Sequence, residues 1–152
     1  MSKKLFIKVV YILYLVGIIA FIFSNSLPSI EESAESSGRL LGFINGILEA
    51  CKLPIMTSDV FIRKAAHFAE FFVLGASVCG YSVFDKKLDV NYAIKSVLFS
   101  CLIAMSDETI QYFTGRGSML LDAWLDLFGA VTGIVICYFI LKKKLKKTWY
   151  LN

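Results

Sequence analysis

One ten-residue segment places four polar side chains in otherwise apolar surroundings. "RKAAHFAEFF", residues 63–72, contains Arg63, Lys64, Glu70 and the only histidine of the chain, His67. An imidazole near a carboxylate can transfer protons or bind a cation, whereas arginine and histidine together can bind an anionic group such as phosphate. Burying a charge in hydrocarbon costs roughly 3 kcal/mol or more, so such residues are rare in membrane helices unless they are paired or functional.

Further polar residues occur in two later apolar segments. At 100° per residue, Asp107 and Gln111 lie on one helical stripe with Glu108 to one side, and Asp122 and Asp126 lie on another. Acidic and amide side chains on facing stripes could bind a ligand or exchange protons. We therefore expect the three segments to turn these stripes toward one another.

The polar residues are also expected at one depth. At 1.5 Å per residue, His67 and Glu70 lie roughly 7–12 Å from the outer end of their helix, and Asp107 and Glu108 lie roughly 8–9 Å from the outer end of theirs. The two aspartates of the last segment occupy its first two turns. Three helices would thus form one polar site in the outer leaflet.

The elements that position this site are four apolar stretches of near-spanning length. The chain of 152 residues is 57% hydrophobic and 18% charged, and about 20 helical residues cross the hydrocarbon of a bilayer. The first stretch is followed by "FSNSLPSIEE" without a small-residue cleavage site, so we interpret it as a retained helix and not as a signal peptide. The sequence predicts an all-α membrane protein, one domain over residues 1–152, with four transmembrane helices at about 5–23, 65–84, 93–113 and 120–141.

The connection from residue 24 to residue 62 contains a further helix signal. Ser29 and Glu32 have capping-box spacing, and "GRLLGFINGILEACKL" repeats apolar residues at helical intervals. We expect a short amphipathic helix that lies on the outer membrane surface or caps the bundle, and a mobile loop is the alternative. In the last apolar stretch, Gly129 and Gly133 are four residues apart, a spacing that lets helix backbones approach closely.

The basic residues predict the orientation. Eleven of the sixteen lie at the two termini and around the second connection, which also forms the cytoplasmic side if the chain crosses four times. We therefore expect both termini in the cytoplasm of a multi-pass protein of the cell membrane. The "KKKLKK" tail indicates an anchor to anionic lipid, and we do not expect nucleic-acid binding. The four cysteines have no paired spacing, so we do not expect them to bind a metal or to act in redox chemistry, and the sequence leaves any cofactor open.

The polar residues have a purely structural alternative. Aspartates at helix ends could serve as caps or pair with Arg116, and Lys64 is expected at the membrane surface, where its long side chain can reach water. Five carboxylates nevertheless face few cations: Glu70, Asp107, Glu108, Asp122 and Asp126. Some of them must be protonated, hydrated or neutralised by a ligand, which favours a site.

These residues resemble the VanZ-like family of membrane proteins. The resemblance extends over nearly the whole chain, and "FSNS" is similar to the serine-rich end of the family's first helix. Where the family often has asparagine, this chain has Asp126. The resemblance implies a cell-envelope protein linked to teicoplanin resistance and no established reaction. The matching motifs are Arg63-Lys64-x-x-His67-x-x-Glu70, Asp107-Glu108-x-x-Gln111, Gly115-Arg116 and Asp122.

Three functions compete on this basis. The first is binding of a membrane lipid, such as a polyprenyl phosphate or a glycolipid, by its head group, with backbone N–H groups of the Gly115–Gly117 turn contributing. The second is a membrane-embedded hydrolase or transferase of cell-wall lipids, with His67, Glu70, Asp107 and Glu108 as candidate catalytic residues or as ligands of a hard divalent cation. The third is an ion-coupled carrier, and a homo-oligomer is left open. The predicted ligand-binding residues are Arg63, His67, Glu70, Asp107, Glu108, Gln111, Arg116, Asp122 and Asp126.

Overall fold

The computed structural model describes residues 2–52, 58–85, 88–115 and 120–149, and within these ranges the regular structure is entirely helical. The helices are α1 (Lys3–Ser26), α2 (Ile30–Ala50), α3 (Asp59–Gly80), the single turn α4 (Ser82–Asp85), α5 (Val90–Phe113) and α6 (Leu120–Trp149). Each long helix contains all or most of one of the apolar stretches predicted from the sequence or of the amphipathic segment between the first two, and the predicted stretch 65–84 is divided, because α3 ends at Gly80 and a separate turn follows at Ser82–Asp85.

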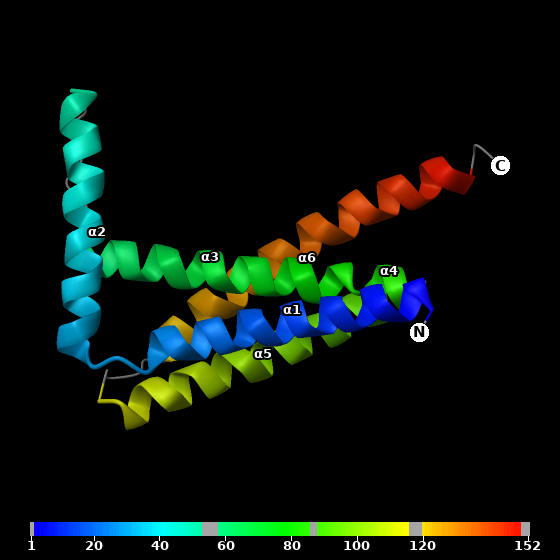
Figure 1. Cartoon of the computed structure of the whole chain (residues 1–152), viewed down its shortest axis with the longest axis horizontal. Helices are drawn as coiled ribbons and strands as arrows, with labels where there is room; N and C mark the ends of the chain where they lie inside the picture. The colour runs from blue at the N-terminus through cyan, green and yellow to red at the C-terminus, as the bar shows by residue number, and fades with distance from the viewer. Residues whose placement is uncertain (1, 53–57, 86–87, 116–119, 150–152) are drawn as a thin grey trace.

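Three long helices run roughly along one axis, a fourth crosses them obliquely and the fifth crosses their end. Figure 1 shows α1, α3 and α5 near this axis, α6 passing behind α3 at an angle and α2 nearly perpendicular to the axis. The start of α1 and the end of α6 both lie at the end of the bundle opposite α2. As a result α3 and α6 are parallel to each other, and the first turns of both lie at the α2 end together with the last turns of α1 and α5.

Three of the described helical segments are long and apolar enough to cross a membrane: Lys3–Ser26, Val60–Asp85 and Leu120–Lys144. The prediction of four such segments is therefore confirmed for three. The stretch predicted at 93–113 does form a helix, the 24-residue α5, but it is not among these three segments.

The polar residues of α5 face inward. Its buried side chains are Ser96, Ser100, Ala104, Asp107, Glu108 and Gln111. Leu98, Leu102 and Met105 lie on the opposite side, and each is at least 60% exposed. A soluble bundle would have the reverse arrangement, with apolar residues inside and polar residues outside.

The contact between α3 and α6 depends on glycines. A Cβ atom at Gly129 would lie 2.5 Å from the carbonyl oxygen of Phe68, and one at Gly133 would clash with that of Phe72. On the facing helix, a Cβ atom at Gly75 would clash with the backbone of Ala130. The close approach predicted from Gly129 and Gly133 is confirmed, and it fixes α3 against α6 near the polar residues.

A small apolar cluster lies farther from the α2 end than His67, Asp107 and Asp126, and it joins all four bundle helices. It consists of Ile22, Phe71, Leu74, Ala104 and Ala130, each no more than 1% exposed. Because its members come from α1, α3, α5 and α6, this cluster sets the relative positions of the helices that carry the polar side chains.

The helix α2 begins where the capping-box prediction placed it. The Ser29 side chain accepts a hydrogen bond from the Glu32 backbone N–H, and the Glu32 carboxylate accepts one from the Ser29 N–H. The helix is 21 residues long, so the expectation of a short helix was wrong, because the polar segment before Arg39 is also helical once it is capped. Exposed apolar side chains at Leu40, Phe43 and Ile47 lie along one face of its second half.

Candidate functional site

His67 lies between two buried aspartates. Its Nδ1 atom is 3.9 Å from Asp107 Oδ2 and 3.9 Å from Asp126 Oδ1. The histidine side chain is 14% exposed, whereas those of the two aspartates are 0% and 2% exposed. Since α3 supplies the histidine and α5 and α6 supply one aspartate each, the structure brings together the three stripes expected to meet.

A second set of contacts holds Asp107 in place. Gln111, one turn later on α5, donates a hydrogen bond of 2.7 Å to Asp107 Oδ2 and a longer one of 3.3 Å to the Ser26 hydroxyl of α1. The Thr114 hydroxyl also donates to the Ser26 carbonyl oxygen, at 3.3 Å. Asp107 therefore belongs to a hydrogen-bonded chain that connects α5 to the last turn of α1.

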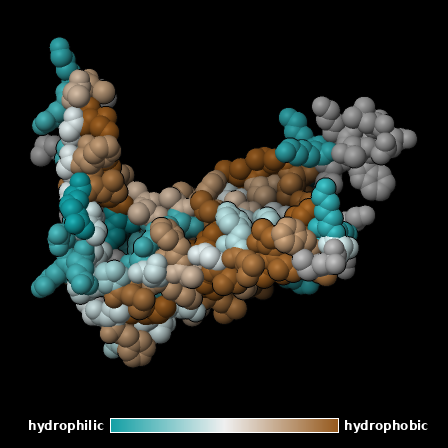
Figure 2. Space-filling view, in the orientation of Figure 1, coloured by the Kyte–Doolittle hydropathy of each residue, from teal (hydrophilic) through white to brown (hydrophobic). Residues whose placement is uncertain are grey.

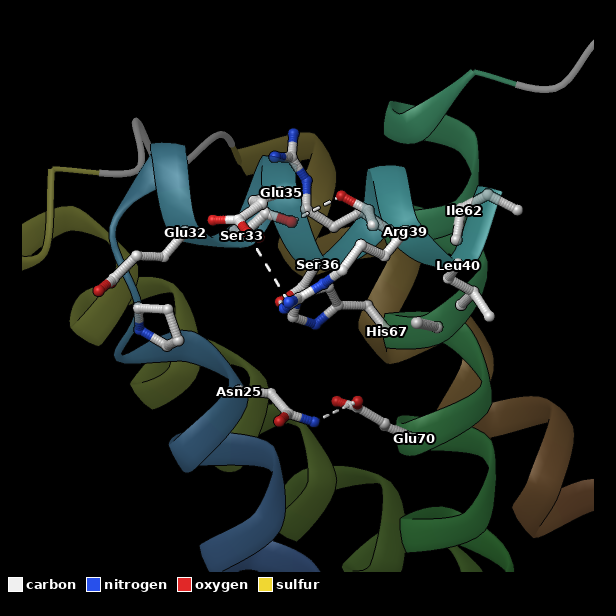
Figure 3. Close-up of a pocket in the computed structure, with 14 residues that line it drawn as sticks. Asn25, Glu32, Ser33, Glu35, Ser36, Arg39, Leu40, Ile62, His67 and Glu70 are labelled. Carbon is white, nitrogen blue, oxygen red and sulfur yellow. Dashed lines mark hydrogen bonds and ion pairs between the residues drawn. The ribbon is translucent and has the colours of Figure 1, made fainter. Parts of the chain in front are cut away.

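Glu70 also contacts α1. The Asn25 side-chain amide donates a hydrogen bond of 2.7 Å to Glu70 Oε1 (Figure 3). Sequence reasoning did not include Asn25 or Ser26 among the site residues, although both lie in the "FSNS" segment that matched the family pattern. Helical spacing within that segment would have found them, because α1 continues through Ser26 instead of ending at residue 23.

The positions of Lys64 and Asp122 differ from the prediction. Lys64 Nζ lies 2.6 Å from Asp122 Oδ1, and the two side chains are 45% and 30% exposed. Lys64 is thus one half of an ion pair between α3 and α6 and not simply a marker of the membrane surface. Asp122, which was grouped with the ligand-binding residues, is neutralised by this lysine one turn before Asp126.

Two other predicted site residues have different outcomes. Glu108 is 9% exposed and follows Asp107 on α5, so it lies at nearly the same depth in the bundle as His67 and the two aspartates. Arg116 lies outside the described residues, as do Gly117 and the rest of that connection. Gly115, the last described residue before it, has φ of +75°, a left-handed conformation that favours glycine at the end of α5.

A pocket opens beside the cluster of His67, Asp107 and Asp126, between α2 and the first turns of α3. Its volume is about 450 Å³. Figure 3 shows Arg39 and the serines on the α2 wall and His67 and Glu70 on the α3 wall, with Asn25 of α1 below. Arg63 also lines it. His67 is shared, since its ring borders the pocket while its Nδ1 atom faces the two aspartates.

The arrangement offers two kinds of chemistry at one end of the bundle. The pocket combines two guanidinium groups and several hydroxyls, which can bind phosphate or sugar oxygens, with three carboxylates, one of which, Glu35, lies 3.7 Å from Arg39. The cluster of His67, Asp107 and Asp126 offers three possible metal-ligand atoms that lie within 4.8 Å of one another. Sequence reasoning named His67 and Asp107 as possible ligands of a divalent cation, but it did not include Asp126 in that set, because residue 126 has no recognisable spacing from the other two.

Comparison with known proteins identifies one family. No curated protein and no solved structure matches the chain significantly. The family model described as VanZ/LLP1 matches residues 9–142, which include every described residue of the pocket and the cluster. Since this match extends over most of the 152 residues, the chain belongs to the VanZ-like family.

Proposed function

We propose that this protein is a multi-pass membrane protein of the cell envelope that binds the head group of an envelope lipid in the pocket between α2 and α3. The observation that carries the proposal is the pocket itself. It has the volume of a small-molecule site, its walls carry charged and hydroxyl groups, and it lies at one end of a bundle whose sides are apolar.

The apolar sides support insertion in a bilayer. Figure 2 shows hydrophobic side chains over most of the visible side of the bundle, with hydrophilic ones gathered at α2 and at the opposite end. We propose α5 as the fourth crossing, because Leu98, Leu102 and Met105 would face lipid while its acidic residues stay inside. Polar residues of membrane helices usually face the bundle interior in this way.

The pocket walls suit a phosphorylated or glycosylated head group. Arg63 can donate to phosphate oxygens, and Arg39 can join it by exchanging its exposed contact with Glu35, while Glu70 can accept from sugar hydroxyls. The Leu40 and Ile62 side chains also line the pocket, and they offer an apolar surface to the first methylenes of a lipid tail. A head group at this position would have its tail directed along the apolar side of the bundle.

The family resemblance connects this site to teicoplanin resistance. Teicoplanin carries a lipid tail and binds cell-wall precursors, so a protein that sequesters or shields an envelope lipid could reduce its effect. We therefore propose polyprenyl phosphates and lipid-linked glycans of the outer leaflet as the ligand class, with the pocket open to the outside.

The direct test is binding of a short-chain polyprenyl phosphate to the purified protein in detergent. Arg63→Gln removes a charged donor worth about 1.5–3 kcal/mol, so affinity for the phosphate should fall roughly tenfold or more. Glu70→Gln should weaken binding only of a glycosylated polyprenyl phosphate, because its carboxylate accepts from sugar hydroxyls and not from phosphate. The matched control is Lys52→Gln, since Lys52 is an exposed cation of the same end of the molecule that does not line the pocket.

The same variants should be compared for membrane abundance and teicoplanin sensitivity in one host. We expect Arg63→Gln and Glu70→Gln to keep abundance near wild type and to lose resistance. If resistance falls only in proportion to abundance, or if Lys52→Gln weakens lipid binding as much as Arg63→Gln does, the pocket is not the binding site.

A further inference from the structure

Three helices converge on a point between His67 and two carboxylates. The ligand atoms of His67, Asp107 and Asp126 all lie within 4.8 Å of one another. The histidine Nδ1 atom is at equal distance, 3.9 Å, from an oxygen of each aspartate. A direct ion-pair contact would favour one partner at hydrogen-bond length, whereas this arrangement is symmetric about the two acids.

The separations suit atoms grouped around a shared cation. Around a zinc ion with bonds of about 2.0–2.2 Å in tetrahedral geometry, neighbouring ligand atoms lie about 3.3–3.6 Å apart. The observed 3.9 Å separations from the histidine to each aspartate are a few tenths of an ångström longer, a difference that side-chain rotation can close. Each ligand comes from a different helix.

Burial makes a positive charge favourable at this point. Asp107 and Asp126 are 0% and 1% exposed. Within the part of the chain that the structure describes, Asp107 Oδ1 and Asp126 Oδ2 are buried without a hydrogen-bond partner, and His67 is the only basic side chain within 4.0 Å of either carboxylate. Two neighbouring buried carboxylates repel each other unless a proton or a cation lies between them.

We propose that His67, Asp107 and Asp126 bind one divalent transition-metal ion of the Zn²⁺ or Mn²⁺ class. The imidazole selects this class over Mg²⁺ and Ca²⁺, which prefer all-oxygen sites. The Gln111 hydrogen bond orients Asp107 as an outer-shell partner would. His67 borders the pocket, which gives an ion a path from solvent. This inference stands apart from lipid binding, since it concerns the metal alone.

The test is equilibrium dialysis of the purified protein, stripped with chelator, against Zn²⁺, Mn²⁺ or Mg²⁺, with bound metal measured by mass spectrometry. We expect one Zn²⁺ or Mn²⁺ per chain and at least about tenfold weaker Mg²⁺ binding. Asp126→Asn should weaken Zn²⁺ binding by at least about tenfold, since loss of even an outer-shell partner costs a factor of about 10 to 100. Asp85→Asn is the control, because Asp85 pairs with Lys8 at the other end of the bundle.

A second readout separates metal binding from folding. Zn²⁺ should raise the melting temperature of the wild type and of Asp85→Asn, and this shift should be lost in Asp126→Asn and in Asp107→Asn. Asparagine keeps the size of aspartate and removes a buried charge, so both variants should fold. Equal affinity for Mg²⁺ and Zn²⁺, no bound metal in the wild type, or unchanged Zn²⁺ binding in both variants would each overturn the proposal.

Discussion

His67 and Lys64 of α3 each lie beside a different aspartate of α6: Lys64 beside Asp122 and His67 beside Asp126. On α3 the two basic side chains are three residues apart, and on α6 their partners Asp122 and Asp126 are four residues apart. Because α3 and α6 are parallel, the two pairs occur in the same order at successive helical turns. Lys64 neutralises the more exposed acid, which leaves His67 with Asp126 and with Asp107 of α5.

This division can be tested with a double-mutant cycle on the outer pair. Lys64→Gln and Asp122→Asn should each lower the free energy of unfolding by no more than about 1 kcal/mol, because both side chains are partly exposed. The double variant should lose less than the sum of the two, since either substitution alone already breaks the pair. Strictly additive losses in reversible unfolding would show that the pair contributes nothing.

Only part of the site could be predicted from residue types. Helical spacing selected His67, Asp107 and Asp126, because a polar residue in an apolar helix has few reasons to be there. It did not decide the role of Lys64, since a lysine that snorkels to the surface and one that pairs with a neighbouring helix look the same in sequence. Asn25 was missed for a related reason: in the sequence it follows the apolar run and reads as a loop residue.

At the scale of helices, the predicted spans follow the apolar stretches, whereas the residues at which the observed helices begin are determined by their N-caps. We expected the second span at 65–84, yet α3 begins at Asp59 because the Ser58 hydroxyl accepts the Phe61 backbone N–H. The charged first turns that carry Arg63 and Lys64 are therefore helical, although hydropathy alone excludes them. The described part of α6 begins at Leu120, the residue at which the predicted span also begins.

The glycine contact between α3 and α6 leads to a prediction about stability. Gly133→Ala places a Cβ atom against the Phe72 backbone, so the two helices must separate, and the folded fraction and melting temperature should fall. The matched control is Gly17→Ala on α1, where a Cβ atom meets nothing within 4 Å. That change should be neutral or stabilising by up to about 1 kcal/mol, because alanine favours helix.

The expected loss for Gly133→Ala should also reach the site. Separation of α6 from α3 moves Asp126 away from His67, so metal or ligand binding should weaken in whatever protein still folds. If Gly133→Ala and Gly17→Ala melt at the same temperature, the close packing of these helices does not stabilise the bundle.

At the scale of the whole molecule, polarity is inverted relative to a soluble bundle. Buried positions include Asp107, Asp126, Gln111 and several serines, whereas many large apolar side chains are exposed along α1, α5 and α6. The chain can be stable in this form only if its sides contact lipid, because exposed apolar surface of this extent is unfavourable in water. Hydropathy alone counts three spans, while the inward polar face of α5 favours a fourth.

The number of crossings decides where the chain ends lie, and this can be measured. Four crossings place both termini on one side of the membrane, and the eleven basic residues near them and in the second connection predict the cytoplasm. Three crossings would place the termini on opposite sides. Cys51 is exposed at the end of α2, so it is a natural probe of the other face.

In spheroplasts, an impermeant maleimide should therefore label Cys51 without lysis, and Cys51→Ala should remove that label. In the Cys51→Ala background, Ser2→Cys and Lys143→Cys should each react only after the membrane is permeabilised, because both positions are exposed and lie at the end of the bundle that the basic residues predict to be cytoplasmic. Cys79 is buried and the two remaining cysteines are partly buried, so they should contribute little background. Labelling of Ser2→Cys and Lys143→Cys on opposite sides would show an odd number of crossings and remove α5 from the membrane. Labelling of both in intact spheroplasts would instead invert the orientation, and the pocket beneath α2 would then face the cytoplasm and not the envelope lipids outside.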